Sequence, residues 1–102
     1  MLEAYIVDAV RTPVGKRGGG FAATHPVDLA AHVISTLVRR HDLDPAGIDD
    51  VIFGCLDNIG AQAGDIARTA ALAAGLPETV PGVTLDRQCG SSQQAVHFAA
   101  QA

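Results

Sequence analysis

Residue types that would mark several classes of protein are scarce or missing here. The 102 residues contain no tryptophan, and aromatic residues make up only 4% of the chain. A core must therefore rely on alanine, valine, leucine and isoleucine, as is common in layered α/β proteins. Hydrophobic residues make up 48% and charged residues 18%, which is typical of a folded domain and not of a disordered chain.

An excess of positive charge and long apolar runs are also missing. The formal net charge is -4, whereas proteins that bind nucleic acid broadly usually show a basic face. No apolar run is long enough to span a membrane, and no charged segment followed by an apolar one marks a secretory signal. We therefore expect a cytoplasmic protein with no nucleic-acid or membrane partner.

Only two cysteines are present, Cys55 and Cys89. Without a secretory signal they predict free thiols in a reducing compartment, although a bridge between the two is conceivable. No CxxC or HxxxH pair occurs, so we expect no metal site. The segment GKRGGG at 15–20 lacks the GxxxxGK[ST] order of a phosphate-binding loop, and no cofactor site is predicted.

The hydrophobic pattern predicts alternating strands and helices. In the first half, Ala4–Val10 is apolar on both faces except at Asp8, as in a strand buried in a parallel sheet. Pro13 and four glycines then interrupt regular structure, and a helix follows over 27–40 with Thr24 as its N-cap.

The second half repeats this alternation. We expect a strand over Val51–Leu56, a helix over Asp65–Ala74 ended by Gly75, a strand over 82–85 and a helix from Cys89 onward. The resulting order β-α-β-α-β-α predicts an α/β fold with parallel strands and right-handed crossovers. Three strands are few for a sheet, and the last helix carries no C-cap signal, so we expect a piece of a longer domain.

Cys89 lies where the third strand gives way to the last helix. A helix N-terminus offers unpaired N–H groups and a positive partial charge, and both favour a thiolate, the nucleophilic form of cysteine. Gly90 leaves room beside the sulfur, and the N–H of Cys89 is placed to stabilise an oxyanion. A buried structural cysteine is the alternative from these residues alone.

Four segments carry a family resemblance: RTPVGKRGGGF at 11–21, VIFGCL at 51–56, AGLPETVPGVTLDRQCGSSQQAV at 74–96 and FAAQA at 98–102. In this order they resemble the N-terminal portion of the thiolase family, the acetyl-CoA acetyltransferases. The resemblance implies a layered α-β-α fold, of which residues 1–102 form a partial N-terminal domain. It also implies that Cys89 is the nucleophile that accepts the acyl group.

Further expectations follow from the same resemblance. Thiolases transfer an acyl group between a cysteine and CoA, with a Claisen condensation or its reverse. Acyl-CoA and CoA are the substrates, no metal or prosthetic group takes part, and the complete protein is expected to be a homodimer or homotetramer. The family's catalytic histidine and second catalytic cysteine lie in downstream segments that do not occur in these 102 residues.

Two alternatives to a thiolase remain open at this stage. One is a relative of the β-ketoacyl synthases, which usually carry a small residue before the cysteine, unlike the Gln88 found here. The other is a non-catalytic fragment or subunit completed by a partner chain. A local base is not expected, since His97 lies two helical turns from Cys89, roughly 12 Å along the axis.

Other residues have more ordinary expected roles. Cys55 is expected to be a small buried residue, and Arg68 to form an ion pair on a helix surface or at an interface. Gln88 is expected to pack near a dimer contact. Asp86 stands where many thiolases carry asparagine, so a hydrogen bond inferred for that asparagine is not carried over.

Overall fold

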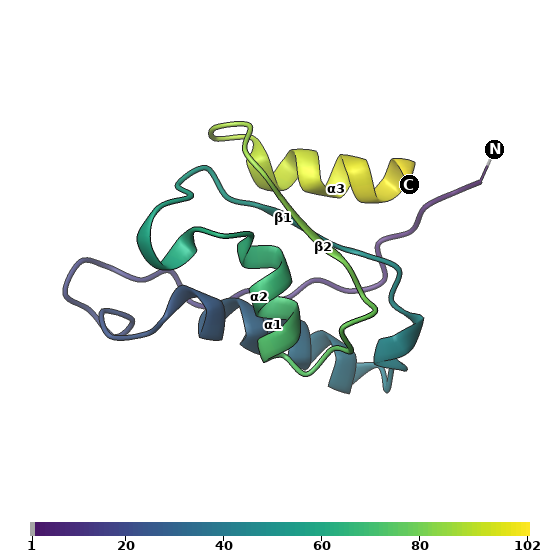
Figure 1. Cartoon of the computed structure of the whole chain (residues 1–102), viewed down its shortest axis with the longest axis horizontal. Coiled ribbons are helices and arrows are strands. Elements are labelled where there is room, and N and C mark those ends of the chain that lie inside the picture. Colours follow the sequence, from purple (N-terminus) through teal and green to yellow (C-terminus); the bar gives the residue numbers. More distant parts are fainter. Residues whose placement is uncertain (1) are drawn as a thin grey trace.

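The computed structural model describes residues 2–102. Three helices alternate with two strands, and two short 3₁₀ turns connect them (Figure 1). The elements are α1 (Pro26–Arg40), η1 (Pro45–Gly47), β1 (Val51–Gly54), η2 (Gly60–Gln62), α2 (Ile66–Ala73), β2 (Gly82–Leu85) and α3 (Ser91–Gln101). The predicted α/β class is confirmed.

The two strands form one parallel sheet, in which Val51 pairs with Gly82 and Gly54 with Leu85. Helix α3 contacts β1 from one face, while α2 packs on the other face and α1 packs against α2 (Figure 1). Because side chains alternate between the faces of a strand, the register places Gly54 and Leu85 on the α3 side. Gly82 lies on the α2 side.

Two glycines allow the helices to approach the sheet closely. A Cβ atom built on Gly54 would lie 2.2 Å from the Ser92 nitrogen and 2.3 Å from the Ser91 carbonyl carbon, both in α3. A Cβ atom on Gly82 would lie 2.8 Å from the Arg68 nitrogen in α2. Each helix therefore contacts the sheet where only glycine fits.

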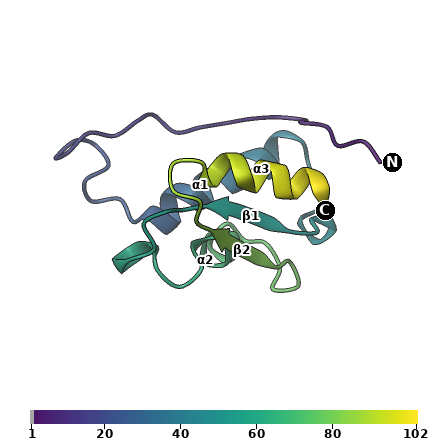
Figure 2. The same cartoon turned by 90° about the horizontal axis from the view of Figure 1, so that it is seen from above.

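The prediction of a first strand over Ala4–Val10 is wrong. This segment pairs with no strand of the described chain, and Figure 2 shows it running outside the helices and strands. Tyr5, Ile6 and Val7 are all more than 75% exposed. An apolar sequence favours a strand only when a neighbour is there to accept its backbone hydrogen bonds.

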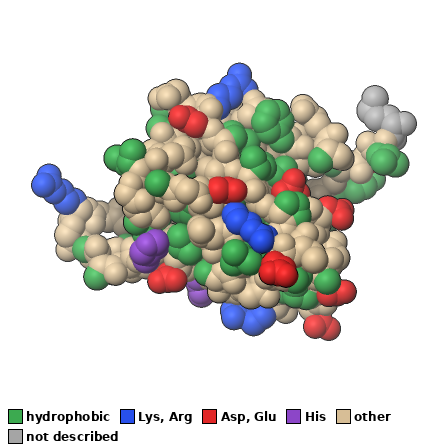
Figure 3. All heavy atoms as spheres, in the orientation of Figure 1, with side chains coloured by type: hydrophobic (Ala, Val, Ile, Leu, Met, Phe, Trp, Pro, Cys, Tyr) green, Lys and Arg blue, Asp and Glu red, His purple; other side chains and the backbone are tan. Residues whose placement is uncertain are grey.

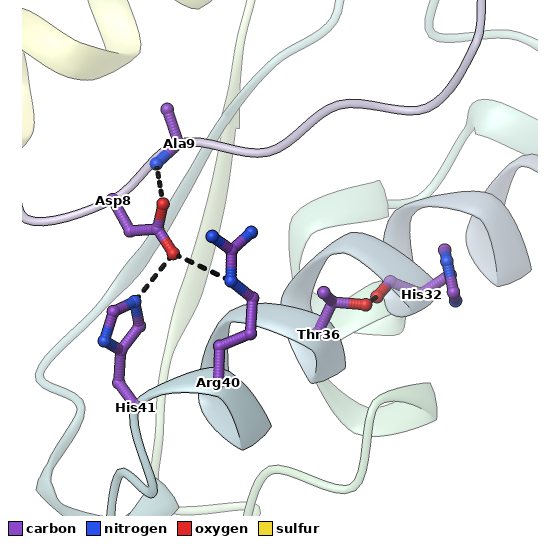
Figure 4. A network of polar contacts seen from close by, with 6 residues as sticks. All are labelled: Asp8, Ala9, His32, Thr36, Arg40 and His41. Atoms are coloured by element: carbon purple, nitrogen blue, oxygen red, sulfur yellow. Dashed lines mark hydrogen bonds and ion pairs between the residues drawn. The ribbon is translucent and has the colours of Figure 1, made fainter.

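The N-terminal segment is instead attached to the rest of the protein through Asp8, its one charged residue between Ala4 and Val10. The Asp8 carboxylate accepts the Ala9 N–H, lies 2.6 Å from His41 Nε2 and pairs with Arg40 Nε at 3.3 Å (Figure 4). These contacts attach the segment to the C-terminal end of α1. The hydrogen bond from His41 is the main reason that the pKa of Asp8 lies below its ordinary value, and the Ala9 N–H lowers that pKa further.

Several predicted boundaries shift in the structure. The N-cap of α1 is His25 and not Thr24: His25 Nδ1 accepts the Val27 N–H at 3.1 Å. Strand β1 ends at Gly54 instead of Leu56, although the Cys55 N–H still donates to the Leu85 carbonyl. The helix predicted to begin at Cys89 begins two residues later.

The buried core lies between α2 and the loop that follows it. Ala71, Leu76 and Val80 form its centre, and Ile34 and Val38 of α1 pack against it. Apolar side chains also remain on the surface, where positive and negative groups are interspersed among them (Figure 3).

Candidate active site

Cys89 lies in the tight turn between β2 and α3, next to Gly90, the N-cap of the helix. Its side chain is exposed, and the thiol is free. Cys55 is also free, so the conceivable disulfide between the two cysteines does not form. Cys55 is half-buried, whereas a fully buried residue was expected. An exposed thiol beside a helix N-terminus is a setting that favours reactivity.

The turn has an unusual backbone. Gln88 has a φ of 49°, in the left-handed region that few residues other than glycine adopt. The Asp86 carboxylate accepts the Gln88 N–H at 2.8 Å. The Asp86 side chain therefore makes a hydrogen bond within this turn, although none was inferred for it from the asparagine that many thiolases carry at this position. Two main-chain bonds close the turn, from Gly90 to Arg87 and from Ser91 to Gln88.

A buried hydroxyl spans the same turn. Ser91 is only 3% exposed, and its Oγ accepts the Arg87 N–H at 2.8 Å while donating to the Gln88 carbonyl at 2.6 Å. Both partners precede Cys89, whereas Ser91 follows it. The hydroxyl thus joins the two sides of the turn that carries the cysteine, a role that the sequence analysis did not identify.

Some backbone donors of this region have no protein acceptor. Within the described part of the chain, the N–H groups of Cys89 and Gln93 donate to no protein acceptor, whereas the Ser92 nitrogen lies against Gly54 of β1. Free donors at a helix N-terminus favour negative charge. They can stabilise a thiolate at Cys89 or an oxyanion that forms beside it.

A cavity of about 590 Å³ opens at the turn. It is lined by Arg87, Gln88, Cys89, Gly90, Gln93, Gln94 and His97. The Arg87 guanidinium donates to Gln94 Oε1 across one side of it. His97 lines the same cavity as Cys89, and no hydrogen bond joins the two side chains.

Arg68 does not form the expected ion pair. Its guanidinium donates to the Val80 carbonyl at 2.6 Å and to the Glu78 carbonyl at 3.0 Å. It therefore ties α2 to the loop before β2 and takes no part in the Cys89 cavity. A planar guanidinium suits two neighbouring carbonyl acceptors, and sequence gives no sign of such a pair.

Neither a metal cluster nor a membrane span is found in residues 2–102. No three His, Cys, Asp or Glu side chains gather as a metal ion would need. None of the helices there is long and apolar enough to cross a membrane.

Comparison with known proteins identifies the family. A family model described as the N-terminal domain of thiolase matches residues 4–102. The chain belongs to the thiolase family. This match, together with the RQCGSS sequence around Cys89, favours thiolase over the β-ketoacyl synthase alternative.

Several thiolases are similar over the full length of the chain. A steroid 3-ketoacyl-CoA thiolase of Mycobacterium tuberculosis is 67% identical over 102 residues, which cover 100% of this chain and 25% of that protein. A 3-ketoacyl-CoA thiolase of Pseudoalteromonas translucida is 48% identical over 104 residues, covering 100% and 27%. The chain thus spans about a quarter of the length of these thiolase relatives.

A solved thiolase shares the fold. The crystal structure of the Bacillus anthracis acetyl-CoA acetyltransferase matches with a TM-score of 0.81 and 44% sequence identity. The match covers 89% of this chain and 23% of that one. The expected thiolase-like α/β fold is therefore confirmed for these elements, apart from the first strand.

Proposed function

We propose that this chain is the N-terminal part of a thiolase-type acyltransferase in which Cys89 accepts the acyl group. The observation that supports it most is the setting of the thiol. Cys89 is exposed and lies beside the N-terminus of α3, and its own N–H and that of Gln93 have no acceptor among the described residues. Membership of the thiolase family supports acyl transfer as the reaction of this thiol.

In the synthetic direction, the first half-reaction is an exchange of thioesters. The Cys89 sulfur attacks the carbonyl carbon of an acyl-CoA and forms a tetrahedral oxyanion, which N–H donors stabilise. The carbon–sulfur bond to CoA then breaks. CoA leaves as a thiol that carries the proton from Cys89, and the acyl group stays on the enzyme.

The second half-reaction regenerates the thiol. In the synthetic direction, a second acetyl-CoA loses a proton, and its carbanion attacks the acyl-cysteine and expels the Cys89 sulfur, which takes up a proton. In the breakdown direction, the Cys89 sulfur first attacks the C3 carbonyl of a 3-ketoacyl-CoA, the C2–C3 bond breaks, and the departing acetyl-CoA carbanion takes up a proton. CoA then attacks the acyl-cysteine, which releases the shortened acyl-CoA and the free thiol. Both directions need an acid and a base. His97 forms no hydrogen bond with Cys89, so these groups are assigned to residues outside this chain.

The proposed substrates are 3-ketoacyl-CoA thioesters and CoA. The names of the similar proteins support this class, and the relative at 67% identity is named as acting on a steroid 3-ketoacyl-CoA. No metal or prosthetic group is proposed. The complete protein is proposed to be a cytoplasmic homodimer or homotetramer, which light scattering during size-exclusion chromatography would test.

Thiolysis by the complete protein tests the proposed function. The purified protein is mixed with acetoacetyl-CoA and CoA, and acetyl-CoA is measured by chromatography. We expect turnover by the wild type and by Cys55→Ser, and none by Cys89→Ser. Equal turnover by both variants would contradict the assignment of Cys89.

Completion by a separate polypeptide is the second candidate, because no base for Cys89 is found among its described contacts. Mass spectrometry of the natural complex would decide. A single polypeptide species would support one long chain, whereas a second polypeptide in fixed ratio to this one would support a two-chain enzyme.

A further inference from the structure

We infer that Ser91 positions the nucleophile: its hydroxyl fixes the turn that holds Cys89 against the N-terminus of α3. This inference rests on the proposed function, since it concerns how the same cysteine is held. Ser91 touches no reacting atom in this account. It acts through the backbone on either side of Cys89.

The Ser91 hydroxyl is connected to both residues that precede Cys89. It accepts from the Arg87 N–H and donates to the Gln88 carbonyl, while the Ser91 backbone N–H also donates to that carbonyl at 3.2 Å. Ser91 therefore makes three hydrogen bonds to the two residues that precede Cys89. A hydroxyl is needed because one group must both accept and donate.

The Ser91 side chain is also buried. Ser91 is the one buried polar residue among those described, with 3% of its surface exposed. If the hydroxyl were removed, the Arg87 N–H would lose its acceptor in a place that water reaches poorly, and such a loss is costly. The turn would then have reason to rearrange, and Gln88 would have reason to leave its left-handed conformation.

Ser91 also lies against Gly54 of β1. Its carbonyl carbon lies where a Cβ atom on Gly54 would come within 2.3 Å. The first turn of α3 is therefore fixed from β1, and the Ser91 hydroxyl fixes the Cys89 turn to that first turn. Together they hold the cysteine at a set place relative to the sheet.

The neighbouring serine provides a matched control. Ser92 is exposed, and its hydroxyl makes no hydrogen bond within the described residues. Ser92→Ala removes the same atom one residue further along the helix. It should alter neither the turn nor the chemistry at Cys89.

Two reactions of the same thiol separate positioning from simple stability. Alkylation by iodoacetamide requires only an accessible thiol, whereas acylation by acetyl-CoA requires the sulfur at a set place beside the oxyanion donors. Both rates are measured for the folded, complete protein by mass spectrometry of the peptide that contains Cys89. The ratio of acylation to alkylation reports orientation when both rates are measured on folded protein isolated by size-exclusion chromatography, because unfolded protein is alkylated but not acylated.

We expect Ser91→Ala to lower this ratio roughly 10- to 100-fold, the effect of misplacing a reacting group by about 1 Å. Ser92→Ala should leave it unchanged, and Ser91→Thr, which keeps the hydroxyl, should recover most of it. A Ser91→Ala protein with the wild-type ratio would overturn the inference. If Ser91→Ala does not fold, Ser91→Thr decides: a ratio near wild type supports the inference, and a collapsed ratio in the folded variant overturns it.

Failure of the proposed function would look different. In that case the wild-type protein itself would be alkylated at Cys89 but not acylated. Ser91 is tested only by the change relative to an acylated wild type, so the two failures cannot be confused.

Discussion

The close contact between Gly54 and α3 predicts that even a methyl group at position 54 will lower both stability and acylation. In Gly54→Ala, the new methyl group would meet the Ser92 nitrogen at 2.2 Å and the Ser91 carbonyl oxygen at 2.6 Å. These are backbone atoms, which cannot rotate away as a side chain can. Moving the nearest of them out to ordinary contact at 3.4 Å requires a displacement of about 1.2 Å at the start of α3.

The size of the effect follows from two opposing contributions. Overpacking at a well-packed contact costs about 1–3 kcal/mol, and a clash with backbone belongs at the upper end of that range. Replacing glycine also stiffens the unfolded chain, which stabilises by about 0.4–1 kcal/mol where the native conformation suits alanine. We therefore expect a net loss of about 2 kcal/mol in the free energy of unfolding. Since a misplacement near 1 Å can cost roughly 100-fold in rate, acylation of Cys89 should fall by a similar factor.

Two other glycines serve as controls in the complete protein. Gly82→Ala meets α2 on the opposite face and requires a displacement of only about 0.6 Å, so it should destabilise while leaving acylation much less affected. Gly47→Ala meets no atom within 4 Å and should change neither property. Denaturant unfolding gives the stability, and mass spectrometry gives the acylation rate. Wild-type stability and acylation in Gly54→Ala would contradict the close contact between Gly54 and the start of α3.

Three further predictions concern the rest of the fold. Thr84 Oγ1 donates to the Asp65 carboxylate at 2.7 Å and accepts the Ala67 N–H at 3.0 Å, so Thr84→Val should lower the free energy of unfolding by about 1–3 kcal/mol, whereas the exposed Thr79→Val should change it little. Denaturant unfolding would measure both, and equal stability of the two variants would contradict the assigned hydrogen bonds. Asp8→Asn should speed tryptic cleavage after Arg11 severalfold at neutral pH, and Asp57→Asn should not. The pKa of Asp8 is lowered by folding, so its contribution is present above the ordinary value of 3.8 and is lost as the pH falls through the lower, folded value. Peptic cleavage within residues 2–10 of the wild type should therefore rise only below pH 3.8, and a rise that begins well above it would contradict the contact.

Local signals in the sequence predicted the elements that depend on local chemistry. An aspartate followed by a proline is a local capping signal, and the Asp44 carboxylate accepts the Ala46 N–H at the start of the turn Pro45–Gly47. Gly75 ends the helix at Ala73 with a φ of 89°, the conformation that glycine favours after a helix. Such features need only a few neighbouring residues, and they can be read from one stretch of chain.

Features that depend on distant contacts were missed. The segment Ala4–Val10 has the composition of a buried strand, but a strand exists only through a partner that composition does not name. The close approach of Gly54 to Ser91 joins residues 37 positions apart, and nothing in either segment indicates it. Cys89 could be selected as a candidate from its place between a strand and a helix, whereas the Ser91 hydroxyl that spans its turn required the structure.

Trapping the acyl-enzyme shows directly whether Cys89 accepts the acyl group. The complete protein is exposed briefly to acetyl-CoA, quenched in acid and digested, and the peptides that carry Cys89 and Cys55 are weighed. We expect one acetyl group on the Cys89 peptide and none on the Cys55 peptide. An unmodified Cys89 peptide, or an acetyl group on Cys55 instead, would contradict it.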